Sequence, residues 1–446
     1  MTGRRPARVV VVNDRSMPVG GASNLARLSV GLLRRAGIEV VFFCGDDPAG
    51  SGLGCEAIGL GEPVLTERAR AGAFVSGLYN GEAFRRLSRL IAETDTADTV
   101  YHVHGWSKIL SPAIFKALRQ VRARTVLHAH DYFLACPNGG FVNFPAQSIC
   151  TLAPMSARCI ATQCDKRGRL QKLWRVGRHV LRNHFYDLGE PANIIAVHQG
   201  MAHYMEKAGV KTDRMRVIPN PVQPWSEGSL QPANQDAFFF VGRLEPEKGI
   251  FDVAEAARRT GLELHVIGEG SARAVLERDY PGVRLHGWMD RPAIADRIRQ
   301  ARAVVIPSRV PEPFSLAALE AAGCGLPVIM PAEALIARDL HNAGAALTFT
   351  SGDVDGLADA MHRLARSATL VRTMAEAARG IAFTLSSTPD GWGDALVEFY
   401  CEIIAEAAPT DRRTITCLQG RRRATHPSPK GSIYARAEPE HDRMGG

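Results

Sequence analysis

The sequence predicts an α/β protein built from two doubly wound domains that follow one another along the chain. Two observations carry this prediction: strand-like apolar segments alternate with amphipathic helical segments, and the alternation restarts after a proline-rich stretch. Such alternation indicates mostly parallel sheets covered by helices on both faces. With 446 residues, 46% of them hydrophobic, the chain is long enough to bury two separate cores.

The first half opens with the strand-like segment ARVVVVND, residues 7–14, followed by a glycine turn that begins a helix over residues 20–37. Leu25, Leu28 and Leu32 recur at helical spacing in that helix. Further strands are predicted over residues 38–45, 99–106, 124–131 and 193–200.

A linker is predicted over residues 216–224, because three prolines interrupt this segment and it has no helical period. The following strands are predicted over residues 237–244, 262–270, 283–288, 302–308 and 326–331. We therefore expect an N-terminal domain at residues 1–215 and a C-terminal domain at residues 222–388. Ligands of doubly wound domains bind at the carboxyl ends of the strands, so the site is expected in the cleft between the two domains.

Two segments complete the expected organisation. A helix over residues 390–406 is expected to pack back on the first domain. Residues 409–446 are polar, basic, rich in proline and glycine and without a period, which predicts a disordered tail.

Charge and hydrophobicity limit the possible partners and compartment. The net charge of +8 favours an anionic partner such as a nucleotide, a nucleic acid or an anionic membrane surface. No apolar run approaches the roughly 18 residues of a membrane span. The apolar run Val9–Val12 is too short for the core of a signal peptide. A cytoplasmic protein is expected, and nine cysteines in so long a chain do not indicate a disulfide framework.

Two basic residues follow the first predicted strand of the second domain. The strand ends at Gly242, Arg243 follows it, and Lys248 comes five residues later. Both side chains can reach one anion at the end of the strand, and a planar fork with a point charge suits a diphosphate. Gly268 follows the next strand, where a glycine lets the backbone approach a ligand closely. The alternative is a pair of solvated surface cations.

Two glutamates, eight residues apart, bracket a predicted helix start in PSRVPEPFSLAALEAAGCGLPVI, residues 307–329. The residues at the expected start of the helix are Phe314, Ser315 and Leu316. Free backbone N–H groups there would bind phosphate oxygens, aided by the helix dipole. Glu320 is then placed to accept hydrogen bonds from ribose hydroxyls, and Glu312 to reach a sugar. The alternative is that both carboxylates only complement the dipole.

At these motifs the chain resembles the retaining glycosyltransferases of family 4, which have the GT-B fold. The matching pieces of the second half are VGRLEPEKG, VIGEG, LHGW and the stretch with the two glutamates. In the first half they are GGASNLARLSVGLLRRAGIEV, YHVHGW and HAHDYFLACPNGG, and VIPNPV resembles the interdomain connection. The resemblance covers about residues 8–405.

The resemblance implies that residues 1–215 form the acceptor-side domain and residues 222–388 the nucleotide-sugar-binding domain. It also implies roles for individual residues. Arg243 and Lys248 would stabilise the donor's diphosphate, Glu312 would bind the hydroxyls of the donor sugar, and Glu320 would hold the ribose. His130 would lie beside the reacting sugar; the alternative is a packed histidine at the end of a strand. The remaining donor-binding residues would be Gly20, Gly21, Gly242, Gly268, Phe314, Ser315 and Leu316. Pro313 and Ser315 depart from the family pattern, which often has glycine at both positions, and Pro313 has no N–H to donate.

The implied function is transfer of a hexosyl-type sugar, with retention, from a UDP- or GDP-sugar to a glycan or lipid-linked acceptor in exopolysaccharide or lipopolysaccharide biosynthesis. Fixed positive charge would stabilise the leaving diphosphate, so no cofactor is expected to be required. The resemblance implies front-face attack, in which the leaving phosphate takes the acceptor's proton. One alternative is an inverting GT-B transferase or an epimerase, against which the two spaced glutamates argue. Another is a non-catalytic protein that binds nucleotide sugars or glycans, which Pro313 would favour.

The segment between residues 136 and 184 is the most distinctive of the chain. Its four cysteines are Cys136, Cys150, Cys159 and Cys164, separated by 13, 8 and 4 residues. Because no C-x₂-C pair occurs, no metal is predicted, and these four thiols are kept only as a weak candidate beside ordinary buried thiols.

Seven basic residues and no acidic one lie between Lys166 and Arg182, interleaved with apolar residues. This pattern predicts a basic amphipathic helix that lies on an anionic membrane surface near a lipid-linked acceptor. The alternative is a solvated helix face. Nucleic acid is not expected as a partner, because no recognised binding module accompanies the charge.

Overall fold

A computed structural model describes residues 4–228 and 230–407 of the protein. The tail predicted over residues 409–446 lies outside the described residues.

The first sheet has seven strands in the order β3-β2-β1-β4-β5-β8-β9, and all neighbours pair in parallel. Its strands are β1 (Arg8–Asn13), β2 (Glu39–Cys44), β3 (Glu56–Gly59), β4 (Thr99–Val103), β5 (Thr125–Ala129), β8 (Asn193–Ala196) and β9 (Met215–Val217). The central strands are buried on both faces, which is why they read as continuous runs such as Val9–Val12 rather than as alternating patterns.

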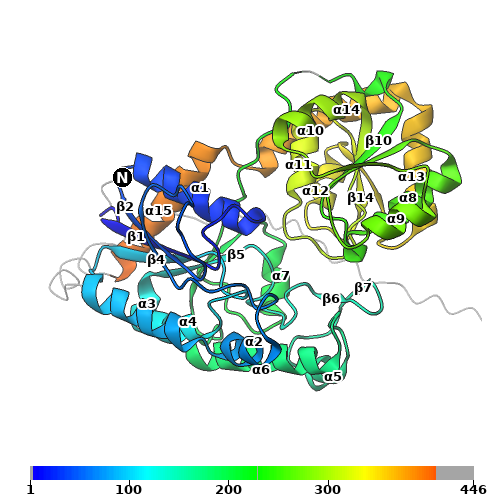
Figure 1. Ribbon diagram of the computed structural model, residues 1–446. Coiled ribbons are helices and arrows are strands. Elements are labelled where there is room, and N and C mark those ends of the chain that lie inside the picture. Colours follow the sequence, from blue (N-terminus) through cyan, green and yellow to red (C-terminus); the bar gives the residue numbers. More distant parts are fainter. Residues whose placement is uncertain (1–3, 229, 408–446) are drawn as a thin grey trace, which may run out of the picture. The chain divides into compact units, whose positions relative to one another are not determined.

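Helices cover both faces of this sheet (Figure 1). They are α1 (Gly21–Arg35), α3 (Gly81–Thr94), α4 (Ala113–Leu118), η1 (Arg119–Arg124) and α7 (Met201–Glu206). The helix α2 (Arg70–Leu78) packs mainly against another helix. The last helix, α15 (Pro389–Ala407), lies beside α1 (Figure 1) and buries Trp392, Leu396 and Tyr400 in the core of this sheet.

A long excursion separates β5 from β8. It contains the hairpin of β6 (Val142–Asn143) and β7 (Ser148–Ile149), the short helix α5 (Ala157–Ala161) and the long helix α6 (Arg169–Phe185). Helix α6 packs against α2 and α4.

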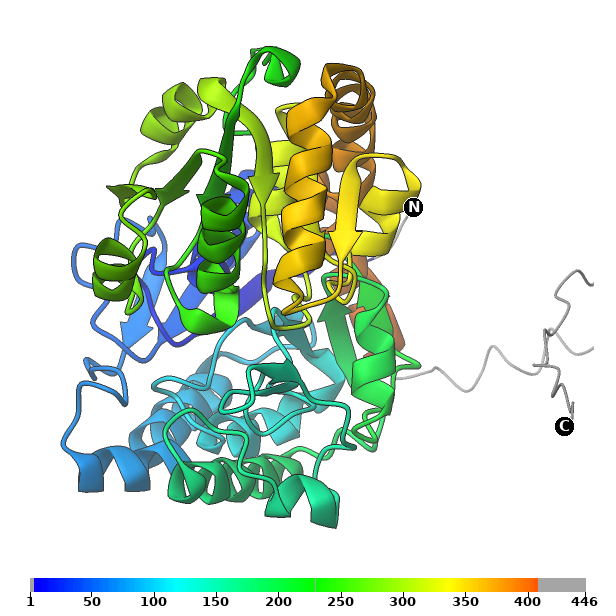
Figure 2. The same cartoon turned by 90° about the vertical axis from the view of Figure 1, so that its right-hand side faces the viewer.

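The second sheet has six parallel strands in the order β12-β11-β10-β13-β14-β15. They are β10 (Ala237–Val241), β11 (Leu264–Ile267), β12 (Arg284–Gly287), β13 (Ala301–Val305), β14 (Val328–Pro331) and β15 (Ala346–Phe349). Figure 2 shows the helices on both sides of this sheet. They are η2 (Pro232–Asn234), η3 (Pro246–Lys248), α8 (Ile250–Thr260), α9 (Arg273–Asp279), α10 (Arg291–Arg297), η4 (Ile298–Gln300), α11 (Leu316–Gly323), α12 (Ala337–Asn342), α13 (Val354–Arg366) and α14 (Ala368–Leu385).

Each sheet therefore has a point where the strand order reverses, between β1 and β4 and between β10 and β13. Ligands of doubly wound sheets bind in the crevice beyond the carboxyl ends of the strands at such points. The predicted fold class, two Rossmann-like doubly wound domains, is confirmed.

The chain passes between the two sheets twice, and the two passages are hydrogen bonded to each other. Pro221 and Ser387 form a parallel bridge. The N–H of Val222 donates to the carbonyl of Ser387 at 3.0 Å, and the N–H of Ser387 donates to the carbonyl of Asn220 at 3.2 Å.

Two details differ from the sequence prediction. The predicted linker at residues 216–224 begins inside β9, because a three-residue edge strand is too short to show a period. The edge strands β3 and β15 were not predicted, since β3 is only partly buried and lacks an apolar run. Among the described residues, no helix is both long enough and apolar enough to cross a membrane.

Candidate active site

A cavity of about 450 Å³ lies at the carboxyl ends of both sheets. Its walls are the start of α1, the loop after β5, the first turns of the β6–β7 excursion, the loop after β10 and the loop before α11. The predicted site residues in its lining are Gly21, His130, Arg243, Lys248, Glu312, Phe314 and Leu316. Residues more than 290 positions apart, such as Gly21 and Leu316, thus line one space.

The loop after β10 carries both predicted cations into the cavity. Arg243 lies two residues beyond the end of β10, is exposed, and has no ion pair with any residue of the described ranges. Lys248 ends the single turn η3, and its Nζ lies 2.5 Å from Glu312 Oε1. The cavity therefore holds one ammonium paired with a carboxylate and one guanidinium that faces open space.

Glu312 lies in the loop that connects β13 to α11, and its side chain is largely buried. Burial alone would raise the pKa of this carboxyl. Lys248 and the hydroxyls of Ser308 and Ser315 outweigh burial and hold the pKa of Glu312 below its usual value. The residue is therefore ionised at neutral pH, and a ligand that takes Lys248 must compete with it.

The start of α11 faces the cavity with backbone donors. Ser315 is the N-cap residue, is 3% exposed, and its side chain caps no backbone N–H of the helix. The N–H groups of the first turn have no partner within the helix, and no acidic side chain lies in that turn. Phe314 and Leu316 line the cavity, as does Pro313, which contributes a ring and no donor.

The start of α1 lies opposite. Gly20, its N-cap residue, has φ +84, a conformation that favours glycine. A Cβ added to Gly21 would lie 3.7 Å from Leu316 Cδ1, so the starts of α1 and α11 approach closely. The first turn of α1 also lacks acidic residues. Two helix N-termini therefore present partial positive charge to one cavity.

The remaining predicted residues lie outside the lining. Glu320 is paired with Arg291, with Nη1 2.5 Å from Oε1; burial raises the pKa of Glu320, and Arg291 partly opposes this rise. Gly242 and Gly268 pack backbone on backbone, since a Cβ on Gly268 would lie 1.8 Å from the carbonyl oxygen of Gly242. Gly268 thus keeps the ends of β10 and β11 together.

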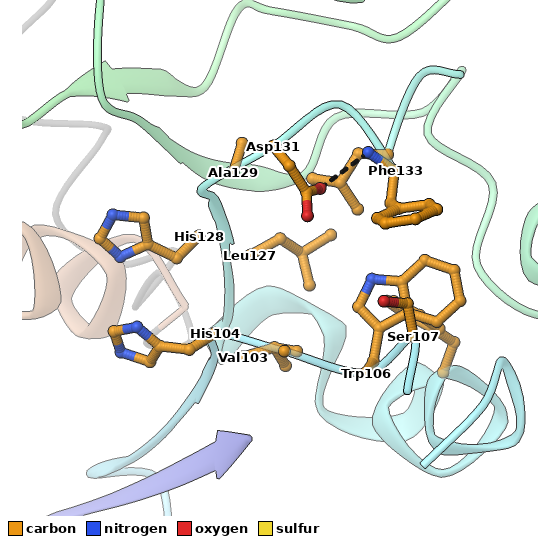
Figure 3. Close-up of a pocket in the computed structure, with 12 residues that line it drawn as sticks. Val103, His104, Trp106, Ser107, Leu127, His128, Ala129, Asp131 and Phe133 are labelled. Carbon is orange, nitrogen blue, oxygen red and sulfur yellow. Dashed lines mark hydrogen bonds between the residues drawn. The ribbon is translucent and has the colours of Figure 1, made fainter. Parts of the chain in front are cut away.

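His130 belongs to a stack of four histidines at the ends of β4 and β5. Ring centroids are 4.0 Å apart for His102 and His104 and 3.9 Å apart for His128 and His130. Figure 3 shows His104 and His128 projecting to one side of the strands, while Val103 and Leu127 project to the other, toward a small cavity closed by Trp106 and Phe133. The alternation follows from the two-residue period of strands.

Hydrogen bonds link these rings in pairs. His104 Nδ1 lies 2.9 Å from His130 Nε2, and His102 Nε2 lies 3.1 Å from His128 Nδ1. The Nδ1 atom of His130 is buried and has no partner among the described residues. Burial lowers the pKa of His130 and His102 to about 3, so both rings are neutral at pH 7. Neutral His130, which lines the cavity, can thus accept or donate a hydrogen bond at this atom.

Among the described residues, His102, His104 and His128 form the one group of at least three metal-ligating side chains whose ligand atoms lie within 4.8 Å of one another. Both ring nitrogens of His102 are already hydrogen bonded, one to His128 and the other to the hydroxyl of Tyr400. A metal would have to displace these bonds, so the geometry favours a hydrogen-bonded stack.

Among the lining residues that were not predicted from the sequence, three have polar side chains with a notable position. The hydroxyl of Tyr132 donates to the carbonyl of Pro311 at 3.0 Å and so connects the loop after β5 to the Glu312 loop. Asn220 is buried, and its Oδ1 has no partner in the described chain. The segment VIPNPV, noted only as a connection, contains Asn220. Asn138 comes from the cysteine-bearing excursion, whose backbone forms one wall.

Two cysteines of the excursion, Cys159 and Cys164, contact the ammonium of Lys172, and no disulfide joins any of the four. Burial raises the pKa of the Cys164 thiol; Lys172 lowers it, and the neighbouring Cys150 and Cys159 raise it. Burial likewise raises the pKa of Cys136.

Helix α6 presents a different face to solvent from the one its basic pattern predicts. Lys172, Arg178 and Arg182 are buried. The Nη2 of Arg182 donates to the carbonyl of Leu134 at 2.5 Å, and Arg178 donates to the carbonyl of Ser107 and stacks on Trp174. The exposed side chains of α6 include the apolar Leu170, Leu173 and Val180.

Comparison with known proteins agrees with this architecture. Sucrose-phosphate synthase from Thermosynechococcus elongatus superimposes with a TM-score of 0.66 at 19% identity, over 90% of this chain and 99% of the other. HepE from Anabaena, solved in complex with UDP-glucose, superimposes with a TM-score of 0.58 at 17% identity, over 90% of this chain and 98% of HepE. The two doubly wound domains and the cavity at their strand ends define the GT-B fold of glycosyltransferases.

The particular family follows from the sequence. The profile of Glycosyltransferase Family 4 matches residues 19–225, and the profile of Glycosyl transferases group 1 matches residues 235–367. The chain belongs to the group 1 glycosyltransferases of family 4. Glycogen synthase from Mycobacterium tuberculosis is 28% identical over 272 residues, which are 57% of this chain and 63% of that enzyme. The match therefore spans less than two thirds of this curated relative.

Proposed function

We propose that the protein is a retaining glycosyltransferase that moves a hexosyl-type sugar from a nucleoside-diphosphate sugar to a glycan acceptor. The observation that carries the proposal is the cavity itself, where Arg243, Lys248 and the start of α11 lie on one wall and His130 and Gly21 on the other. The first wall suits a diphosphate, and the second has room for an acceptor. Their convergence at two topological switch points is the arrangement expected for donor and acceptor.

The proposed donor is a UDP- or GDP-sugar. Breaking the bond between the anomeric carbon and the diphosphate leaves a dianionic group. Fixed positive charges and N–H groups stabilise this leaving group more than they stabilise the intact nucleotide sugar. Arg243 and Lys248 provide point charges, and the starts of α1 and α11 provide backbone N–H groups. The complex of HepE with UDP-glucose supports a uridine nucleotide as the first candidate.

The side chains define the proposed course of the transfer. The donor phosphate draws Lys248 away from Glu312, and the freed carboxylate accepts hydrogen bonds from the donor sugar. Neutral His130, held through Nε2 by His104, offers Nδ1 to a sugar hydroxyl. The acceptor attacks the same face that the diphosphate leaves, and the leaving phosphate oxygen takes the acceptor's proton. No protein carboxylate serves as a nucleophile in this scheme.

The proposed acceptor is lipid-linked, as in exopolysaccharide or lipopolysaccharide synthesis, and is reached at the inner face of the cell membrane. An apolar surface supports this part of the proposal. Leu170 on α6 is 84% exposed, and Phe74 and Val75 on α2 are 55% and 65% exposed. The exposed Arg70 and Arg167 line a groove of about 600 Å³ beside them. An apolar surface next to exposed arginines suits an anionic bilayer.

The test measures thermal stabilisation by UDP, GDP, ADP and their sugar conjugates. A ligand at about 100 times its Kd should add roughly 2.7 kcal/mol of stability. The variant Arg243→Ala/Lys248→Ala should lose the shift, and Arg258→Ala/Arg259→Ala, on the exposed face of α8, should keep it.

Donor turnover then separates the alternatives. Transfer that gives a product with the donor's anomeric configuration, observed by NMR, supports the proposal. Binding without transfer to any glycan would identify a non-catalytic nucleotide-sugar-binding protein. Absence of a shift with every nucleotide would overturn the donor site.

A further inference from the structure

The excursion between β5 and β8 has little regular structure to hold it in place. From residue 136 to residue 168 it forms two strands of two residues each and one helix of five residues. Three of the four non-glycine residues with positive φ in the described chain lie here: Phe141, Gln147 and Met155. Segments of this kind are usually held by a cross-link or a metal rather than by their own core.

The four thiols of the excursion are spread over 29 residues of the chain. In the fold Cys150 and Cys159 influence the pKa of Cys164, and Cys164 that of Cys136, although no three of the four sulfurs lie within 4.8 Å of one another. Cys136 lies in the loop after β5, Cys150 directly follows β7, Cys159 is on α5, and Cys164 follows α5. Cys136, Cys159 and Cys164 are between 5% and 7% exposed. Backbone hydrogen bonds hold the segments that carry the cysteines next to the β6–β7 hairpin. The N–H of Cys150 donates to the carbonyl of Phe141 at 2.7 Å, and the N–H of Phe144 donates to the carbonyl of Cys164 at 3.1 Å.

Two buried polar side chains donate to these sulfur atoms. The ammonium of Lys172 is 3.3 Å from Cys164 Sγ and 3.6 Å from Cys159 Sγ. Asn138 Nδ2 donates to Cys164 Sγ at 3.4 Å, while the thiol of Cys136 donates to Asn138 Oδ1 at 3.2 Å. Lys172 is only 1% exposed, and these two sulfurs are the hydrogen-bond partners of its Nζ within the described chain.

A buried ammonium is costly unless an anion compensates it. Thiols are neutral and weak acceptors, whereas thiolates are anions, and a coordinated divalent cation keeps its cysteine ligands deprotonated. N–H groups aimed at ligand sulfurs are the usual outer partners of a metal–thiolate centre, which carries net negative charge. The donors Lys172 and Asn138 are therefore placed as the surroundings of such a centre.

We propose that Cys136, Cys150, Cys159 and Cys164 bind one Zn²⁺ tetrahedrally, with Lys172 and Asn138 donating to the ligand sulfurs. Four thiolates are a typical structural zinc set, and binding releases the thiol protons to solvent. In the structure no three of these sulfurs lie within 4.8 Å of one another, and the Lys172 ammonium contacts those of Cys159 and Cys164. Binding therefore draws them inward and leaves the ammonium on the outside of the sulfur set.

The proposed zinc would stabilise a wall of the cavity without taking part in the transfer. Asn138, Gly139, Gly140, Val142 and Phe144 line the cavity, and all lie between Cys136 and Cys150. Beyond Cys164, Lys166 pairs with Glu247 at 2.9 Å, beside Lys248. The zinc inference stands independently of the donor's identity.

The first test is the metal content of the full-length protein purified without chelators. We expect one zinc per chain, and X-ray absorption with about four sulfur neighbours at about 2.3 Å. Four thiols should be protected from a thiol reagent until a mercurial releases the metal. The inference is overturned if the protein binds no zinc when purified or reconstituted under reducing conditions, or if absorption shows nitrogen or oxygen ligands only.

Variants locate the site. Cys159→Ser/Cys164→Ser should lose the zinc, whereas Cys401→Ser, on α15 and outside the excursion, should keep one per chain. If the double variant does not fold, zinc content and sulfur coordination of the wild-type protein still decide the matter. Lys172→Met should retain tetrathiolate coordination while weakening zinc affinity about 10–100-fold. Full zinc content in the double variant would contradict the assignment.

Discussion

The hydroxyl of Tyr400 is hydrogen bonded to His102 Nδ1 at 2.6 Å, and both residues are fully buried. Tyr400 lies on α15, which follows the second sheet in the chain but packs against the first. Through His102 and His128 this bond connects the last helix with the histidine stack beside the cavity.

Removing this hydroxyl should destabilise the protein without impairing the site. Tyr400→Phe leaves a buried ring nitrogen of His102 without its partner, at an expected cost of about 1–3 kcal/mol. Chemical denaturation measures the loss. Tyr132→Phe is the matched variant, because it also removes a buried hydroxyl bond, but one that holds the Glu312 loop. It should lower kcat/KM as well. Equal activity of both variants would contradict the distinction.

The histidine stack should make the protein acid-labile. In the folded protein burial lowers the pKa of His102 and His130 to about 3. Burial and then the neighbouring histidines hold the pKa of His104 and His128 well below the usual value. Unfolded histidine titrates near pH 6.5, so between these values the unfolded chain binds more protons. Stability should therefore fall as pH drops below about 6.5, by about 1.4 kcal/mol per pH unit for each histidine.

Urea denaturation between pH 7.5 and pH 5 measures this slope. His130→Gln should reduce it, whereas His203→Gln, which changes an exposed histidine, should not. A flat stability profile over this range would show that the four rings are protonated or exposed in solution.

The pair between Lys248 and Glu312 predicts two separable effects. Lys248→Ala should lower kcat about 10²–10³-fold, because a donor aimed at the leaving group is lost. It should also destabilise the protein, because Glu312 is left buried without its cation. The double variant Lys248→Ala/Glu312→Gln should recover stability but not kcat. If it recovered both, Lys248 would serve only to neutralise Glu312.

Gly249 should tolerate no side chain. Its φ is +70, and a Cβ would lie 1.8 Å from the carbonyl oxygen of Pro307, at the end of β13. Gly261 has nearly the same φ, +69, but open space around it. Gly261→Ala should cost about 1–2 kcal/mol from backbone strain alone. Gly249→Ala should cost about 1–3 kcal/mol more and weaken donor binding, because it displaces the strand end before Glu312. Equal unfolding free energies would contradict the close approach.

The apolar surface of α2 and α6 should bind anionic vesicles. We expect the protein to sediment with vesicles that contain phosphatidylglycerol and not with pure phosphatidylcholine, and Leu170→Glu to weaken binding about tenfold. Phe383→Glu is the matched control, because Phe383 is 57% exposed on α14, away from this surface. Equal binding by both variants would place the membrane contact elsewhere.

Three residues that the sequence singles out in the second domain line one wall of the cavity, because each of them follows the end of a strand. Arg243, Lys248 and Glu312 follow strand ends, and parallel strands bring such positions to one edge. The histidine stack could also have been predicted from the sequence. The motifs YHVHGW and HAHDY each place two histidines two residues apart on neighbouring strands, so the four side chains lie on one face of the sheet. Only His130 was singled out among them.

Other features depend on contacts that no local pattern encodes. The periodicity of α6 indicates an amphipathic helix but not which face is buried, and Lys172, Arg178 and Arg182 face inward because carbonyl groups, aromatic rings and sulfurs receive them. The pairing of Glu320 with Arg291 depends on α10, 29 residues away in the chain. The spacing of the cysteines gave no sign that Cys159 and Cys164 share the Lys172 ammonium, because a loop with little regular structure places these sulfurs beside α6.

The paired passages of the chain between the sheets have a mechanical consequence. A single connecting segment can twist and bend about several axes. Two segments that are hydrogen bonded side by side, as Asn220–Val222 and Ser387 are, resist twisting and bend more easily than they twist. We therefore expect the two domains to move relative to each other mainly by bending about this pair of connections. Asn220 belongs to this pair of connections and also lines the cavity, so each bending movement changes the shape of the cavity.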